Sequence, residues 1–232
     1  PGQVRAAAAI GGTNRLVTVT GPAGTGKTTL LKVARRSLQD QQRNMIVVAP
    51  TRKAATVAAR DIGTAASSVH ALLIDHGYRF ADDAAGRTVW SRLAHGDQDP
   101  LTGAVFRGPQ RYRIRQDDRI VVDEAGMLDL QAANALAQLA ADTGAGIAMI
   151  GDHLQALPVG HSGAMATMQR RSGSVVELTA VHRFRDPAYA ALTLRLRNPA
   201  DREEAVAVAR ELADRGHVEV VGVLVGDQQR VG

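Results

Sequence analysis

The sequence predicts an α/β protein in which a parallel β-sheet is covered by helices on both faces and carries a small inserted subdomain. Apolar runs typical of buried strands alternate with helical patterns along the chain, as in proteins built on a parallel sheet. The alternation breaks at residues 76–116, which are polar and contain five glycines and two prolines. We therefore expect one α/β domain over residues 1–75 and 117–185, with 76–116 as its insertion, and a separate segment over 186–232.

The expected strands are short runs of aliphatic and β-branched residues, which favour strands buried on both faces. The expected helices are longer, and the first of them follows a glycine-rich turn. In chain order, the strands are expected at 16–20, 45–49, 120–122, 147–150 and 175–178, and the helices at 27–41, 52–61 and 130–141.

After residue 185 the pattern predicts two helices, 187–197 and 200–215, followed by a strand at 217–225. The chain ends there without a capping element. We therefore expect residues 186–232 to be the truncated beginning of a second domain.

Within the insertion, residues 104–115 are expected to form a hairpin around a Gly108-Pro109 turn. In its second arm, arginines alternate with apolar residues, so the arginines share one face. The arginines are Arg111, Arg113 and Arg115, and the apolar residues are Tyr112 and Ile114. A solvated edge hairpin is the alternative to a functional one.

The composition predicts a cytoplasmic protein without membrane contact. The chain has no cysteine and no apolar run near the roughly 18 residues that span a bilayer. Only three of the 28 basic residues are lysines, which leaves 25 arginines. The guanidinium group suits phosphate recognition, although an Ala- and Arg-rich composition is also typical of a GC-rich genome. Aromatic residues make up only 3%, which limits base stacking as the main grip on a nucleic acid.

Residues 21–28, GPAGTGKT, fit the phosphate-binding pattern G-x-x-x-x-G-K-[ST] in full. The pattern lies between an expected strand and an expected helix, where main-chain amides and the helix N-terminus can hold a phosphate. Lys27 is expected to bridge the β- and γ-phosphates, and Thr28 to bind Mg²⁺. The expected nucleotide-binding residues are Gly21, Pro22, Ala23, Gly24, Thr25, Gly26, Lys27, Thr28 and Thr29.

Asp123 and Glu124 follow the strand expected at 120–122. Ligands of open α/β sheets bind at the carboxyl edge of the strands. Asp123 is therefore expected to hold Mg²⁺ through water, and Glu124 to act as general base on the attacking water or to orient it. The alternative is an acidic pair that stabilises a helix N-terminus.

Two further residues are candidates for catalysis. Gln155 follows the strand expected at 147–150 and could reach the γ-phosphate, although Gly-Asp sequences such as 151–152 are also common turns. Arg183 is the candidate arginine finger, which would stabilise charge in the transition state; a surface arginine is the alternative.

In combination, these segments resemble the first motor domain of superfamily 1 helicases. The resemblance is closest to the RecD-like group and, within it, to the helicase part of conjugative relaxases (the TraI/TrwC, or MobF, class). The matching segments are GPAGTGKTT (21–29), VVAPTRKAA (47–55), SSVHALL (67–73), VVDEAGML (121–128), GDHLQALPVGHSG (151–163) and LTAVHRF (178–184). The resemblance implies a RecA-like P-loop NTPase fold, ATP and Mg²⁺ as cofactors, and 5′→3′ movement on single-stranded DNA.

The resemblance also implies roles for residues outside the phosphate-binding loop. Gln3 matches the adenine-reading glutamine, although it could be an ordinary helix-surface residue. Two segments match those that touch the DNA backbone, and they contain Pro50, Thr51, Arg52, Ser68 and His70.

His70 could instead be a structural histidine that bonds a nearby loop. The insertion matches a subdomain that sometimes carries a strand-separating pin, which makes the 104–115 hairpin, with Arg111 and Arg113, the candidate pin.

The sequence departs from this family in two respects. The family's F-R-Q motif is replaced by His182-Arg183-Phe184, so the glutamine is lost. We expect only the beginning of the family's second motor domain, without its own arginine, in this sequence.

Three functions remain to be distinguished: an ATP-dependent DNA translocase, a helicase-like module that only binds single-stranded DNA, and an unrelated P-loop ATPase. A module without turnover should have lost the lysine or the acidic pair, and both are present. An unrelated ATPase leaves the SSVHALL and GDHLQALPVG segments unexplained.

Overall fold

The computed structural model describes residues 2–22, 24–82, 84, 86, 88–152, 164–178, 186–197 and 199–216. The chain divides into two compact units, residues 1–183 and 184–232, and each is described by itself. The helices described are too short or too polar to cross a bilayer.

The first unit is built on a six-stranded sheet in which all neighbouring strands are parallel. The strand order is β3-β2-β6-β7-β1-β8. The strands are β1 (Leu16–Thr20), β2 (Met45–Ala49), β3 (Ala66–Ser68), β6 (Arg119–Val122), β7 (Gly146–Gly151) and β8 (Ser174–Glu177). The predicted α/β fold is thereby confirmed.

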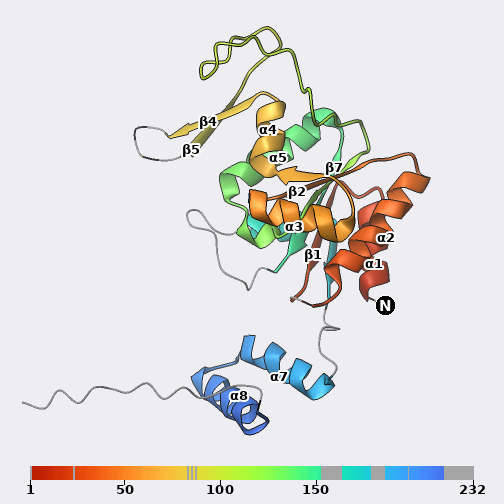
Figure 1. The fold of residues 1–232 in the computed structure, drawn as a ribbon, viewed down its shortest axis with the longest axis vertical. Helices are drawn as coiled ribbons and strands as arrows, with labels where there is room; N and C mark the ends of the chain where they lie inside the picture. The colour runs from red at the N-terminus through yellow and green to blue at the C-terminus, as the bar shows by residue number, and fades with distance from the viewer. Residues whose placement is uncertain are drawn as a thin grey trace, which may run out of the picture. The chain divides into compact units, whose positions relative to one another are not determined.

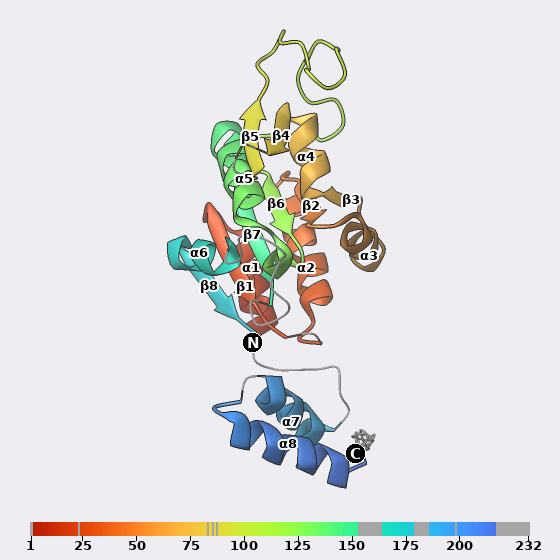
Figure 2. The same ribbon diagram turned by 90° about the vertical axis from the view of Figure 1, so that its left-hand side faces the viewer.

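Helices cover both faces of this sheet (Figures 1 and 2). One face carries α1 (Gly2–Gly11), α2 (Lys27–Asp40) and α3 (Arg52–Ile62). The other carries α4 (Val69–Asp75), α5 (Leu130–Thr143) and α6 (Ala164–Arg171). The predicted helices lie where the sequence places them, with ends that differ by one or two residues.

The core consists of two apolar layers, one on each side of the sheet, because successive strand residues face opposite sides. Val47 and Val121 pack with α1, α2 and α3, whereas their chain neighbours Val48 and Val122 pack with α4, α5 and α6. Each central strand is therefore buried on both faces, which explains why its sequence is continuously apolar.

The insertion contains a hairpin, but it is not the predicted one. β4 (Tyr78–Asp82) pairs antiparallel with β5 (Thr88–Arg92), whereas residues 104–115 contain no strand. The expected hairpin around Gly108-Pro109 is therefore wrong.

Competing hydrogen bonds explain the error. Residues 104–106 bond to 96–99, through Asp99 N to Ala104 O (2.8 Å) and Phe106 N to Asp97 O (2.8 Å). The Asp75 carboxylate, at the end of α4, accepts from the amides of residues 110–112. These partners occupy both arms that the predicted hairpin would have paired.

The predicted alternation of residues 111–115 is nevertheless present. Its three arginines are exposed, whereas Tyr112 and Ile114 are half-buried and pack against the core of the first unit. An extended segment that lies on a domain alternates in burial just as a strand does.

The second unit contains α7 (Pro187–Arg197) and α8 (Arg202–Asp214). The two helices pack through Leu192, Val208 and Leu212. Both agree with the predicted helices; the strand expected at 217–225 lies outside the described residues.

Candidate nucleotide-binding site

The phosphate-binding loop connects β1 to α2 at the carboxyl edge of the sheet. Gly24 and Gly26 have φ angles of 83° and 81°, in the left-handed region that glycine adopts without strain. Gly26 is also the N-cap of α2. Because a glycine has no side chain to cap the helix, the first amides of α2 are left to a phosphate.

Two side chains of the loop hold its curvature. Lys27 Nζ donates to the carbonyl oxygens of Gly21 (3.0 Å) and Pro22 (3.5 Å). The Thr25 hydroxyl is buried and donates to Pro22 O at 2.9 Å. The Thr25 side chain therefore supports the loop, and only the main chain of Thr25 remains for a contact with the nucleotide.

Three other predicted loop residues can be placed only in part. Thr28 and Thr29 are exposed on the first turn of α2, where a hydroxyl can reach a metal ion bound beside the loop. Ala23 lies outside the described residues.

Gln3 lies on α1 and binds the loop from outside. Its amide Nε2 donates to Thr25 O at 2.9 Å, and a Cβ at Gly26 would collide with the same amide. Gln3 therefore makes a specific contact that an ordinary helix-surface residue would not. The contact with adenine stays a prediction.

The acidic pair follows β6 at the same edge. Asp123 N donates to Val48 O at 2.8 Å, which extends the ladder between β2 and β6 by one residue. Burial raises the pKa of Asp123, and the charge of Glu124 raises it further, while the charge of Lys27 lowers it. Lys27, in the loop after β1, and Asp123, after β6, therefore lie at the same edge of the sheet, with β7 between their strands.

Glu124 has a φ of 53°, a left-handed conformation that is uncommon outside glycine and often marks a functional site. The turn that follows packs tightly against the end of β7, since a Cβ on Gly126 would lie 2.6 Å from Asp152 O. Local sequence patterns indicate no role for Gly126 or Gly151, although a glycine two residues after an acidic pair, such as Gly126, can mark a close approach of the backbone.

Asp123→Asn is expected to raise the thermal unfolding midpoint of the nucleotide-free protein at neutral pH. Because the folded pKa of Asp123 lies above its unfolded value, its protonated form is favoured in the folded state. The stability that this preference contributes is fully present below the ordinary aspartate pKa, about 3.9. It is lost as the pH rises through the folded pKa. Thermal unfolding at several pH values checks this: the difference between the variant and the wild type should shrink in acid. A variant less stable than the wild type at neutral pH would contradict it.

The residues predicted to touch the DNA backbone lie at neighbouring strand ends. Ala49, the last residue of β2, pairs with Ser68 of β3, and α3 and α4 begin there. Thr51 Oγ1 accepts from Ala54 N at 3.1 Å, and Ser68 Oγ accepts from Ala71 N at 3.2 Å. Both hydroxyls cap their helices and keep a proton to donate to a phosphate.

Accessibility separates these two hydroxyls. Thr51 and Arg52 are exposed and Pro50 is half-buried, whereas Ser68 is buried. Thr51 is therefore the more accessible hydroxyl.

Among the described residues, His70 contacts rings of the hairpin. Its ring centroid lies 5.4 Å from that of Phe80 and 5.3 Å from that of Trp90. Arg111 and Arg113 lie on the exposed side of the 111–115 segment, and the Arg111 guanidinium stacks 5.2 Å from the centre of the Tyr112 ring. Gln155 and Arg183 lie outside the described residues.

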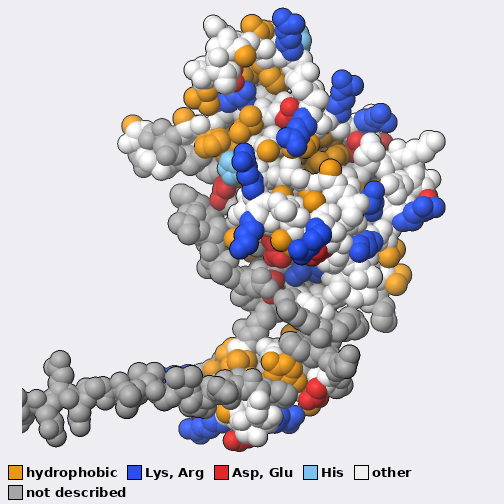
Figure 3. Space-filling view, in the orientation of Figure 1, with side chains coloured by type: hydrophobic (Ala, Val, Ile, Leu, Met, Phe, Trp, Pro, Cys, Tyr) orange, Lys and Arg blue, Asp and Glu red, His pale blue; other side chains and the backbone are white. Residues whose placement is uncertain are grey.

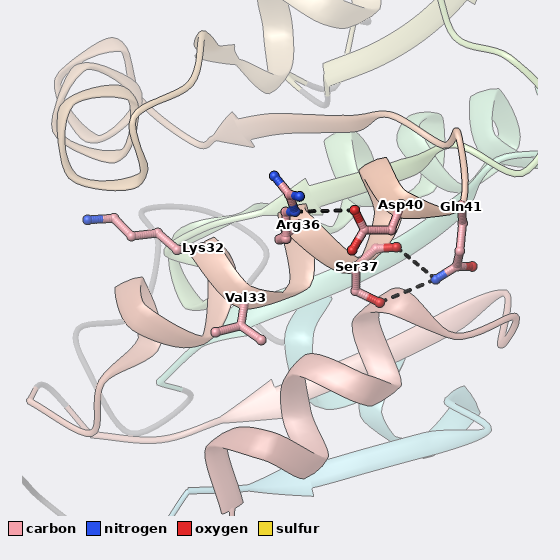
Figure 4. Close-up of a pocket in the computed structure, with 6 residues that line it drawn as sticks. All are labelled: Lys32, Val33, Arg36, Ser37, Asp40 and Gln41. Atoms are coloured by element: carbon pink, nitrogen blue, oxygen red, sulfur yellow. Dashed lines mark hydrogen bonds and ion pairs between the residues drawn. The ribbon is translucent and has the colours of Figure 1, made fainter.

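A hollow of about 600 Å³ lies along the outer face of α2 (Figure 4). Its side chains form helix-surface contacts, namely the Arg36–Asp40 ion pair and the bonds of Gln41 to Ser37. None of the residues predicted to bind the nucleotide lines it. The hollow is therefore separate from the predicted nucleotide-binding loop.

The parallel sheet, with the loop after β1 and the acidic pair after β6, defines a RecA-like P-loop NTPase fold. The chain belongs to the AAA domain family, whose sequence model matches residues 1–222. Comparison with curated protein sequences gives no match.

Solved structures of Pif1 helicases share the fold. A Pif1 structure described as showing DNA unwinding at forked double-stranded DNA has a TM-score of 0.57 at 21% identity, over 90% of this chain and 50% of that chain. Unliganded Pif1 from Bacteroides sp gives 0.55 at 21% identity, over 90% and 48%. Pif1 helicase from Candida albicans gives 0.52 at 20%, over 84% and 43%. The chain thus spans about half the length of these structures.

Proposed function

We propose that the chain is the ATP-binding and ATP-hydrolysing motor domain of a DNA helicase or translocase. The observation that carries this proposal is that the glycine-rich loop with Lys27, after β1, and the carboxylate of Asp123, after β6, lie at one edge of a parallel sheet. A lysine beside main-chain amides and a carboxylate across one strand is the arrangement that a nucleoside triphosphate with its metal ion requires.

The residues present fit Mg²⁺. Burial and Glu124 both disfavour the charge of Asp123, and a cation beside it would offset that cost. Asp123, through water, and the Thr28 hydroxyl would hold the ion. Bound Mg²⁺ would neutralise charge that develops on the phosphates.

Each residue of the site would then have a separate role in hydrolysis. Lys27 would hold the β- and γ-phosphates, and Glu124 would take the proton of the attacking water or orient that water. Gln155 would sense the γ-phosphate, and Arg183 would stabilise charge in the transition state.

We further propose that the motor moves 5′→3′ on single-stranded DNA and belongs to a conjugative relaxase-helicase. The DNA unwinding named for the Pif1 structure supports a nucleic-acid partner. The strand backbone would contact Pro50, Thr51, Arg52, Ser68 and His70, with Arg111 and Arg113 as further cationic contacts.

Residues 186–232 would begin the second motor domain, which would contribute its own arginine. A trans arginine contributes about 10³ to 10⁵ in related phosphoryl transfers, so turnover by this chain alone is expected to be weak.

Lys27→Ala is expected to weaken the binding of a fluorescent ATP analogue with Mg²⁺ by about 10- to 150-fold, as expected for the loss of hydrogen bonds to a charged group. Fluorescence titration of both proteins measures this. Lys32→Ala is the matched control, since Lys32 lies exposed on the outer face of the same helix (Figure 4). Equal affinities of the wild type and Lys27→Ala would overturn the assignment of the site.

A further inference from the structure

Aromatic residues are scarce in this chain but concentrated in one place. The sequence has three phenylalanines, three tyrosines and a single tryptophan. Five of these seven lie in the insertion, and they are Tyr78, Phe80, Trp90, Phe106 and Tyr112. The low overall content therefore does not exclude base stacking at this one site.

Three rings, which we call the ring cluster, meet where the hairpin packs on α4: His70, Phe80 and Trp90. Phe80 and Trp90 are directly opposite each other on β4 and β5, with ring centroids 5.0 Å apart. The His70 ring contacts both, edge-on to Phe80 at 84° and tilted at 51° to Trp90. The cluster thus places His70, a candidate DNA contact, against the hairpin.

The ring cluster is not packed as a closed core. Phe80 is 45% exposed, and Trp90 is half-buried. Within the described part of the chain, no acceptor is bonded to the buried indole N–H of Trp90. A phenylalanine at this position would attach the hairpin without that unfavourable buried donor, so attachment alone does not account for the tryptophan.

Basic residues lie near the ring cluster. His70 lies on the first turn of α4, two residues after Ser68 and beside the strand end that carries Thr51 and Arg52. Arg92 lies on the same face of β5 as Trp90, with its guanidinium 5.0 Å from the centre of the Tyr78 ring, and it forms an ion pair with Asp142. In Figure 3, hydrophobic side chains gather where α4 meets the hairpin, and Lys and Arg side chains surround them on the same face.

We propose that the ring cluster is a stacking platform for an unpaired base of single-stranded DNA, with Phe80 and Trp90 as its stacking residues. This inference rests on the proposed function and adds to it where the strand's bases lie. Every base has a flat π-face that stacks on aromatic rings, and its phosphates favour nearby cations. In a duplex the bases are paired and stacked inside, so the platform selects a single strand.

Trp90 makes the proposal directly measurable, because it is the chain's single tryptophan and its emission reports on the platform. Unlabelled oligothymidine is titrated into the wild-type chain, and an abasic strand of equal length serves as the comparison. Oligothymidine is expected to quench Trp90 emission with the same dissociation constant that fluorescence anisotropy gives for a labelled strand. The abasic strand should bind more weakly and leave the emission unchanged.

Phe80→Ala tests the platform by mutation. Base–aromatic stacking is worth about 1–3 kcal/mol, so the affinity for oligothymidine is expected to fall about 5- to 150-fold. Affinity for the abasic strand, and the dependence of binding on salt concentration, should stay unchanged, since stacking releases no counterions. Val89→Ala is the matched control, because Val89 is 51% exposed and lies on the other face of the same hairpin.

Further measurements separate the possible failures. Unchanged affinity for the ATP analogue and an unchanged thermal midpoint show that the Phe80→Ala protein is folded; if it is not, Phe80→Leu takes its place. Oligothymidine that binds without altering Trp90 emission would overturn the platform and leave the proposed function intact. A wild-type chain that binds the ATP analogue but neither strand would overturn the DNA part of the proposed function as well.

Discussion

Glu124→Gln is expected to lower the rate of ATP hydrolysis about 10²- to 10⁴-fold, the usual contribution of a positioned general base. The affinity for the ATP analogue should change little, because the amide keeps the size and shape of the carboxylate. The rate is measured with radiolabelled ATP under single-turnover conditions, with single-stranded DNA present, since weak turnover is expected of this chain.

The structure supports the division of roles behind this prediction. Asp123 comes directly after β6 and is constrained by its bond to β2, whereas Glu124 takes the left-handed conformation at the start of the next turn. Burial and Glu124 raise the pKa of Asp123, which suits a residue whose charge a metal ion balances. We therefore expect Glu124, rather than Asp123, to act on the attacking water.

Asp40→Asn serves as the control for Glu124→Gln. It makes the same change from carboxylate to amide, but at an exposed position at the end of α2. It should leave the hydrolysis rate unchanged. A Glu124→Gln protein that hydrolyses ATP as fast as Asp40→Asn would exclude Glu124 as the base.

Most of the sheet could be predicted from the sequence because its central strands are buried on both faces and therefore continuously apolar. β3 could not be predicted in the same way. Its three residues, Ala66–Ser68, are small or polar, and they form a strand because β2 offers a free edge for pairing. The α4 helix that follows has only seven residues, too short for a clear helical period.

The insertion shows why alternation alone does not define a hairpin. The 111–115 segment alternates because it lies along the domain, and its amides bond to Asp75, far earlier in the chain. The observed hairpin pairs Phe80 with Trp90, and five residues containing Gly86 separate its strands. Which of two polar, glycine-containing turns closes a hairpin depends on packing against α4 and α5, which no local pattern contains.

Those parts of the candidate site that are contiguous in sequence could be predicted. Contacts between distant segments could not. The loop and the acidic pair follow from local patterns beside predicted strands. The contact of Gln3 with Thr25, and that of His70 with the hairpin rings, each join parts of the chain brought together only by the fold. The same holds for the close approach of Gly126 to Asp152.

Arg119→Ala is expected to lower the free energy of unfolding by about 3–5 kcal/mol, because it leaves both a cavity and buried carbonyl groups without donors. Arg119 begins β6 and is fully buried. Its guanidinium donates to Asn14 O at 2.7 Å and to Gly12 O at 2.8 Å. Urea unfolding of the wild type and the variant measures the change.

Keeping the charge of Arg119 buried carries a cost. Burial lowers the pKa of Arg119 to about 10, with a smaller effect from the charge of Arg43, and the hydrogen bonds that the guanidinium donates offset that cost. Arg119→Lys should therefore also be destabilised, since an ammonium group cannot reach both carbonyls as the planar guanidinium does.

These hydrogen bonds hold the C-terminal end of α1. Near the N-terminal end of the same helix, Gln3 contacts the phosphate-binding loop. Arg43 and Gln41 donate to the same segment, at Gly11 O and Gly12 O, so three side chains hold this helix terminus. Arg113→Ala, an exposed arginine, should change stability by no more than about 0.5 kcal/mol. If Arg119→Ala were no less stable than Arg113→Ala, the buried arginine would have no structural role, and α1 would have to be held by Arg43, Gln41 and its apolar face.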